Sequence, residues 1–546
     1  MKKYFNELNT VFTIQLATII FVIFDILPRE TLLFSGGLLA LFALRGSIEE
    51  SVFMIARCIP LFTALPLTSG FDSFNVWRVI VLIIFIKWIW QYNVLAKTLN
   101  VLSDIFEKAK SNFRAAVAFA YKNWRVEFLC AVLLLVSVLS LAKADDVLIG
   151  VKRIIYFINL GALFFIARSA ANKNNINKIA FNALLSGALI VFIGFVQLAS
   201  AYYMSVDNFS DFWALKVEKT LYGTAWANIA IAANTWFAYY NGTIHLRMFS
   251  SFPDTHSFPI YLLMVIGFAV ILFFSSKEKI KKAAIFALMA FAMASLILTG
   301  TRGIWASALF PALLLGHLFF KKEISRRAAV SAGLPLILFL VFLPLSSLVF
   351  NSAQFAMTGG SAGDKVFSER IKSIIDTNEV SNSGRIYIWK ETLASIARNP
   401  ILGVGIGNFP TILKQNPTAI KAGASAHNLY LNFFAELGIF GFAAAILIIY
   451  EILKKSRQLF KNSEFAVWFF GLNALLYLIW ILWYNMTDVA IFDERAFLLL
   501  MIFVGTIFAL ERSDIHRGST FAPDGNPRQG DEASDAEHRP LTSFCL

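Results

Sequence analysis

The strongest constraint on the fold is a series of long apolar segments that recurs along most of the chain. Hydrophobic residues make up 58% of the 546 residues, charged residues only 15%, and the mean hydropathy is +0.66. A soluble domain is about half apolar and about a quarter charged, so this composition is typical of an integral membrane protein. Allowing about 17 to 22 apolar residues for each span, we expect an all-α, polytopic membrane helical bundle of about 12 to 14 spans.

The basic residues indicate how these spans are oriented. Clusters of Lys and Arg at 277–282, 321–327 and 454–457 fall on one side if the spans alternate, and the positive-inside rule makes that side cytoplasmic. Orientation in the membrane also accounts for the net charge of +13, so we expect no nucleic-acid partner. The basic stretch 93–125 is expected on the same side, as an amphipathic segment beside membrane lipid.

The apolar pattern divides the chain into six regions. The last of them is rich in Ser, Gly, Pro, Asp and Arg, a composition that cannot bury enough surface to fold. We expect N-terminal membrane spans over 1–200, an outer-side loop over 201–258, spans with a short Arg302 turn over 259–350, a larger outer-side loop over 351–436, spans over 437–511, and a disordered cytoplasmic tail over 512–546.

The larger outer-side loop contains a predicted amphipathic helix. Apolar residues recur at helical spacing over 386–396 until Pro400 ends the pattern, and Ser383 is a suitable N-cap. Arg385 would then lie in the first turn, where a bound anion would offset its unfavourable interaction with the helix dipole. The alternative is an Arg385 side chain that extends to water or pairs with Glu379.

Three closely spaced glycines follow this helix. Gly403, Gly405 and Gly407 resemble half of a dinucleotide-binding fingerprint, but no βαβ unit surrounds them. We therefore expect a tight backbone path that passes close to a neighbouring segment or a ligand.

The loop ends with a histidine and a polar stripe. His427 precedes a helix that enters the next span, and Asn428, Asn432 and Glu436 follow at i, i+4 and i+8. A polar stripe entering a membrane helix is expected to face protein or a water-filled cavity. His427 has a side chain suited to a general base near neutral pH, and the alternative is a structural histidine bonded to a backbone carbonyl.

Two further arginines lie close to the ends of outer-side spans. Arg302 sits in a turn of about five residues, and Arg247 lies just before a span; guanidinium groups at this level suit a diphosphate, with lipid headgroups as the alternative ligand. His245 and His256 do not have the spacing of a helical zinc site, and the three cysteines form no CxxC pair. We expect neither a metal nor another cofactor.

Taken together, these motifs resemble the O-antigen ligase and O-antigen polymerase superfamily, which includes bacterial protein O-oligosaccharyltransferases. The resemblance covers about 245–441, while the N-terminal spans match only in hydropathy. The pattern near Arg247 departs from the family, because Asp254 and His256 stand where a Pro-Asn type pair is usual. The matching motifs are Ser383-Gly-Arg385 with Trp389, Asn399-Pro400, Gly403-x-Gly405-x-Gly407-x-Phe409, His427-Asn428-x-Tyr430, Glu436-x-Gly438-x-x-Gly441 and Thr299-Gly-Thr-Arg302-Gly.

The resemblance implies a metal-independent, GT-C-like glycosyltransferase of the bacterial inner membrane. The outer side is then the periplasm, and 351–436 is the large periplasmic catalytic loop. The donor would be a glycan on undecaprenyl diphosphate, held by Arg247, Arg302 and Arg385. His427 would activate the acceptor hydroxyl, and Asn428, Tyr430 and Glu436 would help to bind substrate.

The motifs leave the acceptor open. A ligase transfers to a lipid A core sugar, a polymerase to another lipid-linked repeat, and a protein transferase to Ser or Thr. We favour the ligase because the large loop is long and rich in motifs. The alternative from another class is a non-catalytic polysaccharide flippase or transporter, although we detect no duplicated half.

Overall fold

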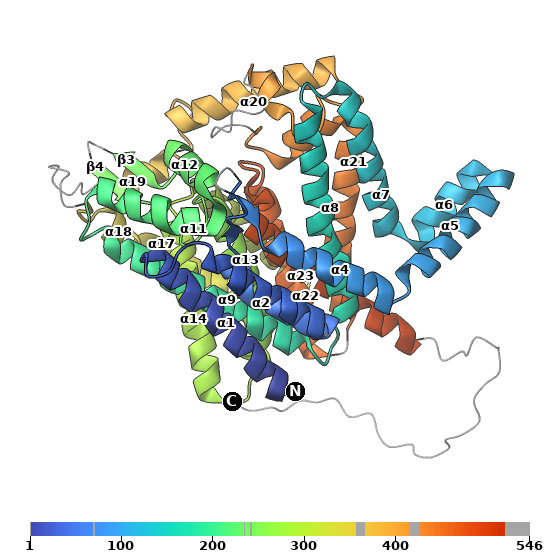
Figure 1. Cartoon of the computed structure of the whole chain (residues 1–546), viewed down its shortest axis with the longest axis horizontal. Coiled ribbons are helices and arrows are strands. Elements are labelled where there is room, and N and C mark those ends of the chain that lie inside the picture. Colours follow the sequence, from blue (N-terminus) through green and yellow to red (C-terminus); the bar gives the residue numbers. More distant parts are fainter. Residues whose placement is uncertain are drawn as a thin grey trace.

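A computed structural model describes residues 2–68, 71–233, 235–240, 243–355, 366–414, 425–462 and 464–518. The chain is predominantly helical, which confirms the all-α, polytopic fold expected from the sequence (Figure 1). The strands that are described form two short antiparallel pairs: β1 (Ala64–Leu65) with β2 (Phe74–Asn75), and β3 (Phe237–Tyr240) with β4 (Thr243–Leu246).

In the described ranges, nine helices are long and apolar enough to cross a bilayer, or up to ten if the bent pair α4 (Trp77–Gln91) and α5 (Val94–Ser111) counts as one span. The nine are α7 (Arg125–Ser140) with the turn after it, α8 (Val147–Ala170), α9 (Ile176–Ser200), α13 (Ser257–Ser275), α14 (Lys279–Leu298), α15 (Arg302–Ser307) with α16 (Leu309–Phe320), α17 (Arg326–Leu345) with α18 (Ser347–Phe350), α21 (Leu429–Gln458) and α22 (Phe465–Tyr484).

The count is below the expected 12 to 14 because several apolar segments form short or charged helices. Helix α2 (Thr31–Arg45) and the described part of α1 (Lys2–Ile23) are apolar but shorter than a full span. The segment expected to span after them forms only the 11-residue helix α3 (Ile48–Cys58), a 3-10 turn and strand β1. Helix α23 (Glu494–Gly518) carries charged residues in its first turn.

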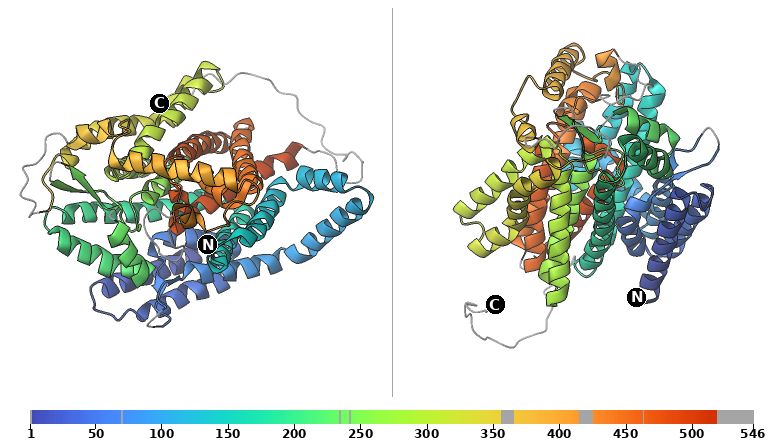
Figure 2. Two further views of the ribbon diagram at one scale, coloured as in Figure 1. Left: turned by 90° about the horizontal axis from the view of Figure 1, so that it is seen from above. Right: turned by 90° about the vertical axis from the view of Figure 1, so that its left-hand side faces the viewer.

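Helices α13 and α22 form the centre of the bundle. In the apolar stretches of these two helices 83% and 72% of the residues are buried, against 56% or less in the other helices of span length. Aromatic rings join them to α23: the Phe268 and Phe503 rings lie 5.1 Å apart edge to face, and Phe470 lies 5.4 Å from Phe503. The remaining spans surround this core, with α7, α8 and α21 on one side (Figure 2).

Polar caps mark where the chain turns back into the bundle. Asp146 caps α8, Ser325 caps α17 and Asn428 caps α21, and each side chain accepts a hydrogen bond from a backbone N–H in the first turn. Such caps satisfy donors that a helix end leaves unpaired. Helix α23 continues to Gly518, so the expected tail boundary at 512 lies inside a helix, and 519–546 lie outside the described residues.

Both of the loops expected on the outer side contain secondary structure. The larger loop contains α19 (Val366–Lys372), α20 (Val380–Arg398) and the 3-10 turn η4 (Phe409–Leu413), with α20 lying across the end of the bundle (Figure 1). The smaller loop contains α10 (Val206–Ser210), a π-helix (Asp211–Glu218), α11 (Lys219–Tyr222), α12 (Thr224–Ala233), β3 and β4.

Helix α21 is broken at Gly438, where the backbone has φ +63° and ψ −167°. The break leaves backbone carbonyls of α21 without helical partners, and the glycine-rich loop (residues 403–407) supplies new ones. The N–H groups of Val404 and Gly405 donate to the carbonyls of Ala435 and Glu436 at 2.9 and 3.1 Å. In return, the N–H of Ile439 donates to the carbonyl of Pro400 at 2.8 Å. A broken membrane helix needs such replacement partners because the bilayer core offers none.

This close approach explains why glycine stands at these positions. Gly403 and Gly405 have φ +66° and +93°, and a Cβ on Gly403 would lie 2.4 Å from the Ala435 carbonyl oxygen. A Cβ on Gly438 would lie 2.1 Å from the carbonyl oxygen of Ile401. The expectation of a tight path close to a neighbouring segment is therefore confirmed.

We predict that Gly438→Ala lowers stability by about 1–3 kcal/mol or more, because it adds both a steric clash and an unfavourable backbone conformation. Gly161→Ala is the matched control, because no atom lies within 4 Å of its added Cβ. The measurement is thermal unfolding of the purified proteins in detergent, followed by tryptophan fluorescence. Equal midpoints for the two variants would contradict this account of the break.

Glu218, at the end of the π-helix, is a buried acid that sequence analysis did not identify. The side chain is 1% exposed, and neither carboxyl oxygen has a hydrogen-bond partner among the described residues. Burial raises the pKa of Glu218 to about 8, although the nearby Arg495 guanidinium opposes this effect; Asp493 and Asp254 raise the pKa further.

Because the folded-state pKa of Glu218 lies above its ordinary value, the folded protein binds this proton more tightly than the unfolded chain. The residue therefore costs stability as pH rises from about 4 to about 8. We predict that Glu218→Gln raises the unfolding midpoint relative to wild type, and that this gain is larger at pH 8 than at pH 5. Exposed Glu107→Gln is the control, and a gain independent of pH would contradict the assignment.

Candidate functional site

The turn between α14 and α15 connects several elements of the site. The Nε and Nη2 atoms of Arg247 donate to the Thr299 carbonyl and the Thr301 hydroxyl at 3.1 and 3.2 Å. Its Nη1 atom donates to the carbonyl of Thr235 at 3.0 Å. Arg247 thus fixes the end of β4 to the turn, and these contacts engage all three guanidinium nitrogens.

Arg370, on α19, holds the same turn from the other side and was not identified from the sequence. The side chain is 4% exposed, and its Nε donates to the carbonyl of Gly300 at 2.8 Å. Gly300 has φ +59°, and a Cβ there would lie 2.7 Å from the guanidinium of Arg370. Arg370 lies outside every recognisable motif, so only the fold reveals its role.

Arg302 begins α15 and is paired with α20. Its Nη2 atom lies 2.9 Å from Oε2 of Glu379, and its Nη1 donates to the carbonyl of Ser373 at 3.1 Å. The alternative in which Glu379 pairs with Arg385 is therefore wrong, because Glu379 pairs with Arg302 instead. The expected tight turn before Arg302 is confirmed as residues 299–301.

Arg385 lies in the second turn of α20. The predicted N-cap at Ser383 is wrong: the helix begins at Val380, because the Glu379 side chain accepts the backbone N–H of Asn382 at 3.1 Å. This earlier start moves Arg385 away from the positive end of the helix dipole. Within the described ranges Arg385 forms no ion pair, and its Nε atom is buried without a hydrogen-bond partner.

His427 lies immediately before α21 in a strained backbone conformation. Its φ is +44°, a region that non-glycine residues enter rarely and that is enriched at functional sites. Asn428 caps the helix by accepting N–H groups of Tyr430 and Leu431, both at 3.0 Å. The Nδ1 atom of His427 is buried and has no partner among the described residues, which removes the alternative of a bond from this atom to a backbone carbonyl.

The electrostatic surroundings keep His427 in its neutral form. Burial lowers the pKa of His427, and the positive charges of Arg385 and His256 lower it further, whereas the Asp488 carboxylate raises it in part. The backbone N–H of Leu429 donates to the carbonyl of Asn485 at 2.8 Å, which places the segment that contains His427 beside the segment that contains Asp488. A neutral imidazole has the free nitrogen that a proton acceptor requires.

The buried Asp488 and the partly buried His256 form a pair beside His427. Nδ1 of His256 lies 2.8 Å from Oδ2 of Asp488, and the hydroxyl of Tyr484 donates to the His256 carbonyl at 3.1 Å. Burial alone would raise the pKa of Asp488, but the contact with His256 and the positive charge of Arg385 outweigh this effect and hold the pKa well below its usual range. The carboxylate therefore stays ionised. From the sequence alone, His256 lacks the spacing of a zinc ligand and departs from the family pattern, and nothing singles out Asp488 as a site residue.

The other predicted substrate-binding residues have structural contacts. Asn428 is the helix cap, the Tyr430 hydroxyl donates to the carbonyl of Leu482 at 3.0 Å, and Oε1 of Glu436 accepts the Phe409 N–H at 3.4 Å. These contacts fix α21 to α22 and to the glycine-rich loop. Their role in substrate binding stays a prediction.

The arrangement combines an unpaired cation, a neutral imidazole and an ionised carboxylate on the side of the bundle where α21 begins. Arg247, Arg302 and Arg370 fix the surrounding turns, while Arg385 remains available to a ligand. Such a site can bind an anion and accept a proton from a hydroxyl group. Over the described part of the chain, no three His, Cys, Asp or Glu side chains are grouped so as to hold a metal ion.

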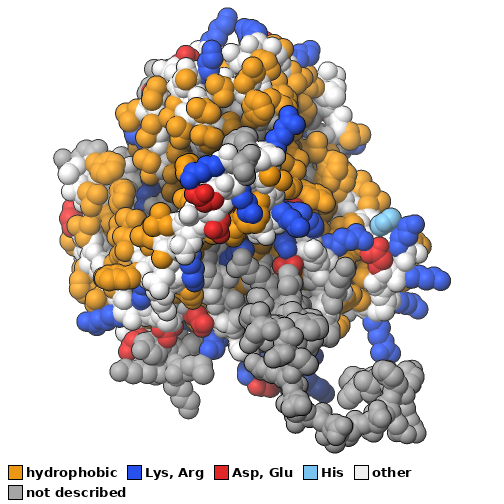
Figure 3. Space-filling view, turned by 90° about the vertical axis from the view of Figure 1, so that its right-hand side faces the viewer, with side chains coloured by type: hydrophobic (Ala, Val, Ile, Leu, Met, Phe, Trp, Pro, Cys, Tyr) orange, Lys and Arg blue, Asp and Glu red, His pale blue; other side chains and the backbone are white. Residues whose placement is uncertain are grey.

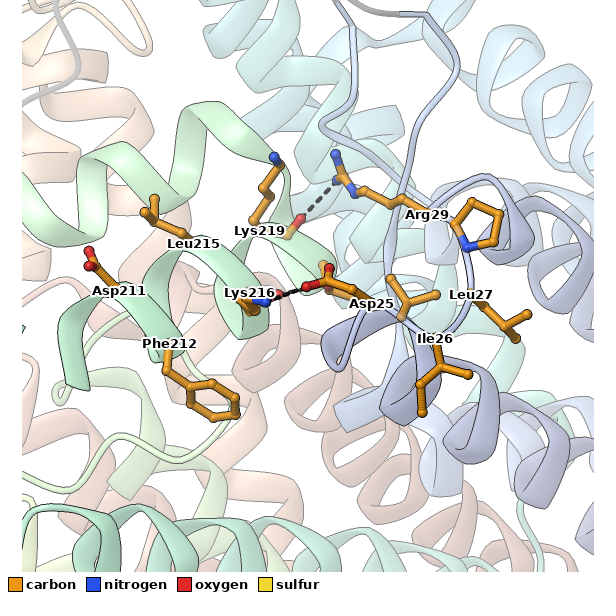
Figure 4. A pocket seen from close by; sticks show the side chains of 12 residues that line it. Asp25, Ile26, Leu27, Arg29, Asp211, Phe212, Leu215, Lys216 and Lys219 are labelled. Carbon is orange, nitrogen blue, oxygen red and sulfur yellow. Dashed lines mark hydrogen bonds and ion pairs between the residues drawn. The ribbon is translucent and has the colours of Figure 1, made fainter. Parts of the chain in front are cut away.

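A pocket of about 810 Å³ lies elsewhere, between the α1–α2 connection and the π-helix (Figure 4). Three of its five charged side chains have ion-pair partners: Lys216 pairs with Asp25, and Arg29 pairs with Asp72 and also donates to the Lys219 carbonyl. None of the predicted site residues lines it, so we assign it no ligand.

Comparison with known proteins identifies one family. Residues 284–446 match the family model described as O-antigen ligase, which confirms the superfamily recognised from the motifs. The matched range contains Arg302, Arg385 and His427 but not His256 or Asp488. No curated protein matches the chain.

We predict that Asp488→Asn moves the pKa of His427 further down, because the variant removes the negative charge that raises it. Diethyl pyrocarbonate reacts with neutral imidazole, so modification of His427, followed by peptide mass spectrometry across a pH series, reports this pKa. The midpoint is expected at lower pH in the variant than in wild type. An upward shift would contradict the proposed position of Asp488.

Proposed function

Since residues 284–446 form a domain of the O-antigen ligase family, we propose that this multi-pass membrane protein transfers a glycan from undecaprenyl diphosphate to an acceptor hydroxyl. The observation that carries the proposal is Arg385, an arginine without a partner among the described residues, close to a neutral, partly buried His427. The diphosphate of the donor would be the anion that pairs with Arg385, and the acceptor hydroxyl would be the group that donates a proton to His427.

On the donor side, Arg385 binds the diphosphate through its planar guanidinium group. Arg302 and Arg247 support binding from the neighbouring turn, and Arg302 reaches the phosphates only by sharing or releasing Glu379. Preorganised cations stabilise the charge that develops on a leaving diphosphate. The step therefore depends on positioning and electrostatics, both of which the protein supplies.

On the acceptor side, His427 accepts the proton of the hydroxyl group. The hydroxyl oxygen bonds to the anomeric carbon of the glycan while the bond from that carbon to the diphosphate oxygen breaks, and the electron pair leaves with the diphosphate. Asp488 stabilises the imidazolium that forms, because its ionised carboxylate raises the pKa of His427. His256 holds Asp488 in place at 2.8 Å.

The charge distribution supports a periplasmic position for this site in a bacterial inner membrane. Basic side chains gather at the C-terminal end of α21, where Lys455 pairs with Glu511 and Arg457 with Glu323. His427 precedes the opposite end of the same helix. By the positive-inside rule the basic end is cytoplasmic, so the site faces the periplasm. The acceptor we propose is a lipid A core sugar.

We predict that Arg385→Lys loses most of the transfer activity, because an ammonium keeps the charge but not the planar two-pronged grip. His427→Ala is expected to reduce the transfer rate by about 10²- to 10⁴-fold while still binding donor. The measurements are glycan transfer by purified, membrane-reconstituted protein and binding of the lipid-linked donor. Arg398→Lys, an exposed change on the same helix, is the control.

These measurements also separate the competing functions. Transfer to lipid A core supports the ligase, and transfer to a second lipid-linked repeat or to a protein hydroxyl would reassign the acceptor. Full transfer by both Arg385→Lys and His427→Ala would contradict the roles proposed for these two residues, whereas a wild-type protein that transfers no glycan would favour a non-catalytic transporter.

A further inference from the structure

Helices α5 and α6 (Phe113–Asn123) form a hairpin that projects from the bundle (Figures 1 and 2). The chain bends by 67° between α4 and α5, so α5 leaves the direction of the preceding helix. The elements that pack substantially against α5 are α4 and α6. Most of the hairpin surface is therefore free of contacts with the rest of the protein.

One face of α5 is apolar and uncovered. Leu95, Leu99, Leu102 and Phe106 follow one another at i, i+4, i+7 and i+11, and each is 54% to 66% exposed. This spacing places all four side chains on a single stripe of the helix. An amphipathic helix with such a stripe lies in the membrane interface, with its apolar face towards the acyl chains.

A groove of about 380 Å³ runs beside this hairpin, where α6 meets α7. Arg114 lies among the apolar side chains of Val117, Ala118, Tyr121 and Phe128, which line the rest of the groove. Across the described residues, Arg114 has no ion-pair partner. The surface of the groove is almost wholly apolar, and the exposed Arg114 is its one charged lining residue among the described residues.

The surrounding charge is also positive. The hairpin contains Asp104 and Glu107 as its acidic residues, and Glu107 pairs with Lys110 at 2.7 Å. Figure 3 views the side from which the hairpin projects and shows Lys and Arg side chains among exposed apolar ones. The basic residues of the hairpin are Lys97, Lys108, Lys110, Arg114 and Lys122.

The hairpin lies at the opposite end of α21 from the candidate site. Arg125, which begins α7 next to the hairpin, pairs with Glu451 near the C-terminal end of α21 at 3.1 Å, whereas His427 precedes the N-terminal end. This location is the basic end of the bundle, where an anionic membrane surface attracts Lys and Arg. The groove is therefore separate from the site proposed for transfer.

We propose that the α6–α7 groove binds an anionic phospholipid. The phosphate lies against Arg114, an acyl chain lies along Val117, Tyr121 and Phe128, and the α5 stripe enters the same leaflet. The combination of one cation and an apolar groove matches both parts of a phospholipid, and the excess of basic residues selects an anionic headgroup over a zwitterionic one. The lipid holds the hairpin on the membrane surface.

The test uses full-length protein reconstituted in nanodiscs that contain equal amounts of phosphatidylglycerol and phosphatidylcholine. Native mass spectrometry after release then measures the retained lipids. Wild type is expected to retain phosphatidylglycerol preferentially, and Arg114→Gln to retain several-fold less of it. Lys97→Gln removes the same charge outside the groove and is expected to lower the retention of phosphatidylglycerol much less. No preference in wild type, or equal losses in the two variants, would overturn the proposal.

A second measurement tests the α5 stripe independently. With the native cysteines replaced by alanine, Leu99→Cys and Asp104→Cys each carry an environment-sensitive fluorophore. Brominated lipids are expected to quench the label at position 99 strongly and the label at position 104 on the polar face weakly. Equal quenching at both positions would show that α5 does not lie in the interface and would overturn this part of the proposal.

Discussion

The structure depends on the hydrogen-bond partners that the chain supplies to the backbone groups at the break in α21. Backbone groups in a bilayer have no water to replace a lost helical bond, so a break persists only where protein supplies partners. Here the segment around Gly403 and Gly405 supplies them, through hydrogen bonds with Ala435, Glu436 and Ile439. These hydrogen bonds fix the glycine-rich loop to α21, and the same loop follows α20 directly in the chain. The positions of Arg385 and His427 are therefore tied to one backbone junction.

The four arginines around the site divide into two groups by their contacts. Arg247, Arg302 and Arg370 bond to backbone carbonyls of neighbouring segments, and these bonds hold the α14–α15 turn, β4, α19 and α20 together. Arg385 has no such bond among the described residues. A buried guanidinium nitrogen without a partner is costly unless a ligand or water meets it. This difference, rather than the presence of arginine in a motif, separates the residue that we propose as the main contact of the ligand from those that hold the surrounding segments.

Local patterns in the sequence predict the helical bundle, the turn before Arg302, and the helix that follows His427. They do not predict Arg370, or the pairing of Asp488 with His256, because these contacts join segments 70 or more residues apart. The cap of α20 was misplaced because Ser383 is a common N-cap type, whereas the longer side chain of Glu379 reaches the backbone from an earlier position. In the described residues fewer helices reach span length than the hydropathy predicts, because hydropathy does not show that an apolar stretch such as α3 ends after 11 residues.

Glu379 has one further consequence for the geometry of the site. Its Oε2 atom accepts the N–H of Asn382 at 3.1 Å and the Nη2 of Arg302 at 2.9 Å, so one oxygen belongs both to the start of α20 and to the start of α15. Arg302 and Arg385 are therefore connected through the Glu379 carboxylate and less than two helical turns of α20, and this connection sets the distance between them. A shift of α15 or α20 changes the distance between the two guanidinium groups, and the contacts of Glu379 with both helices oppose such a shift.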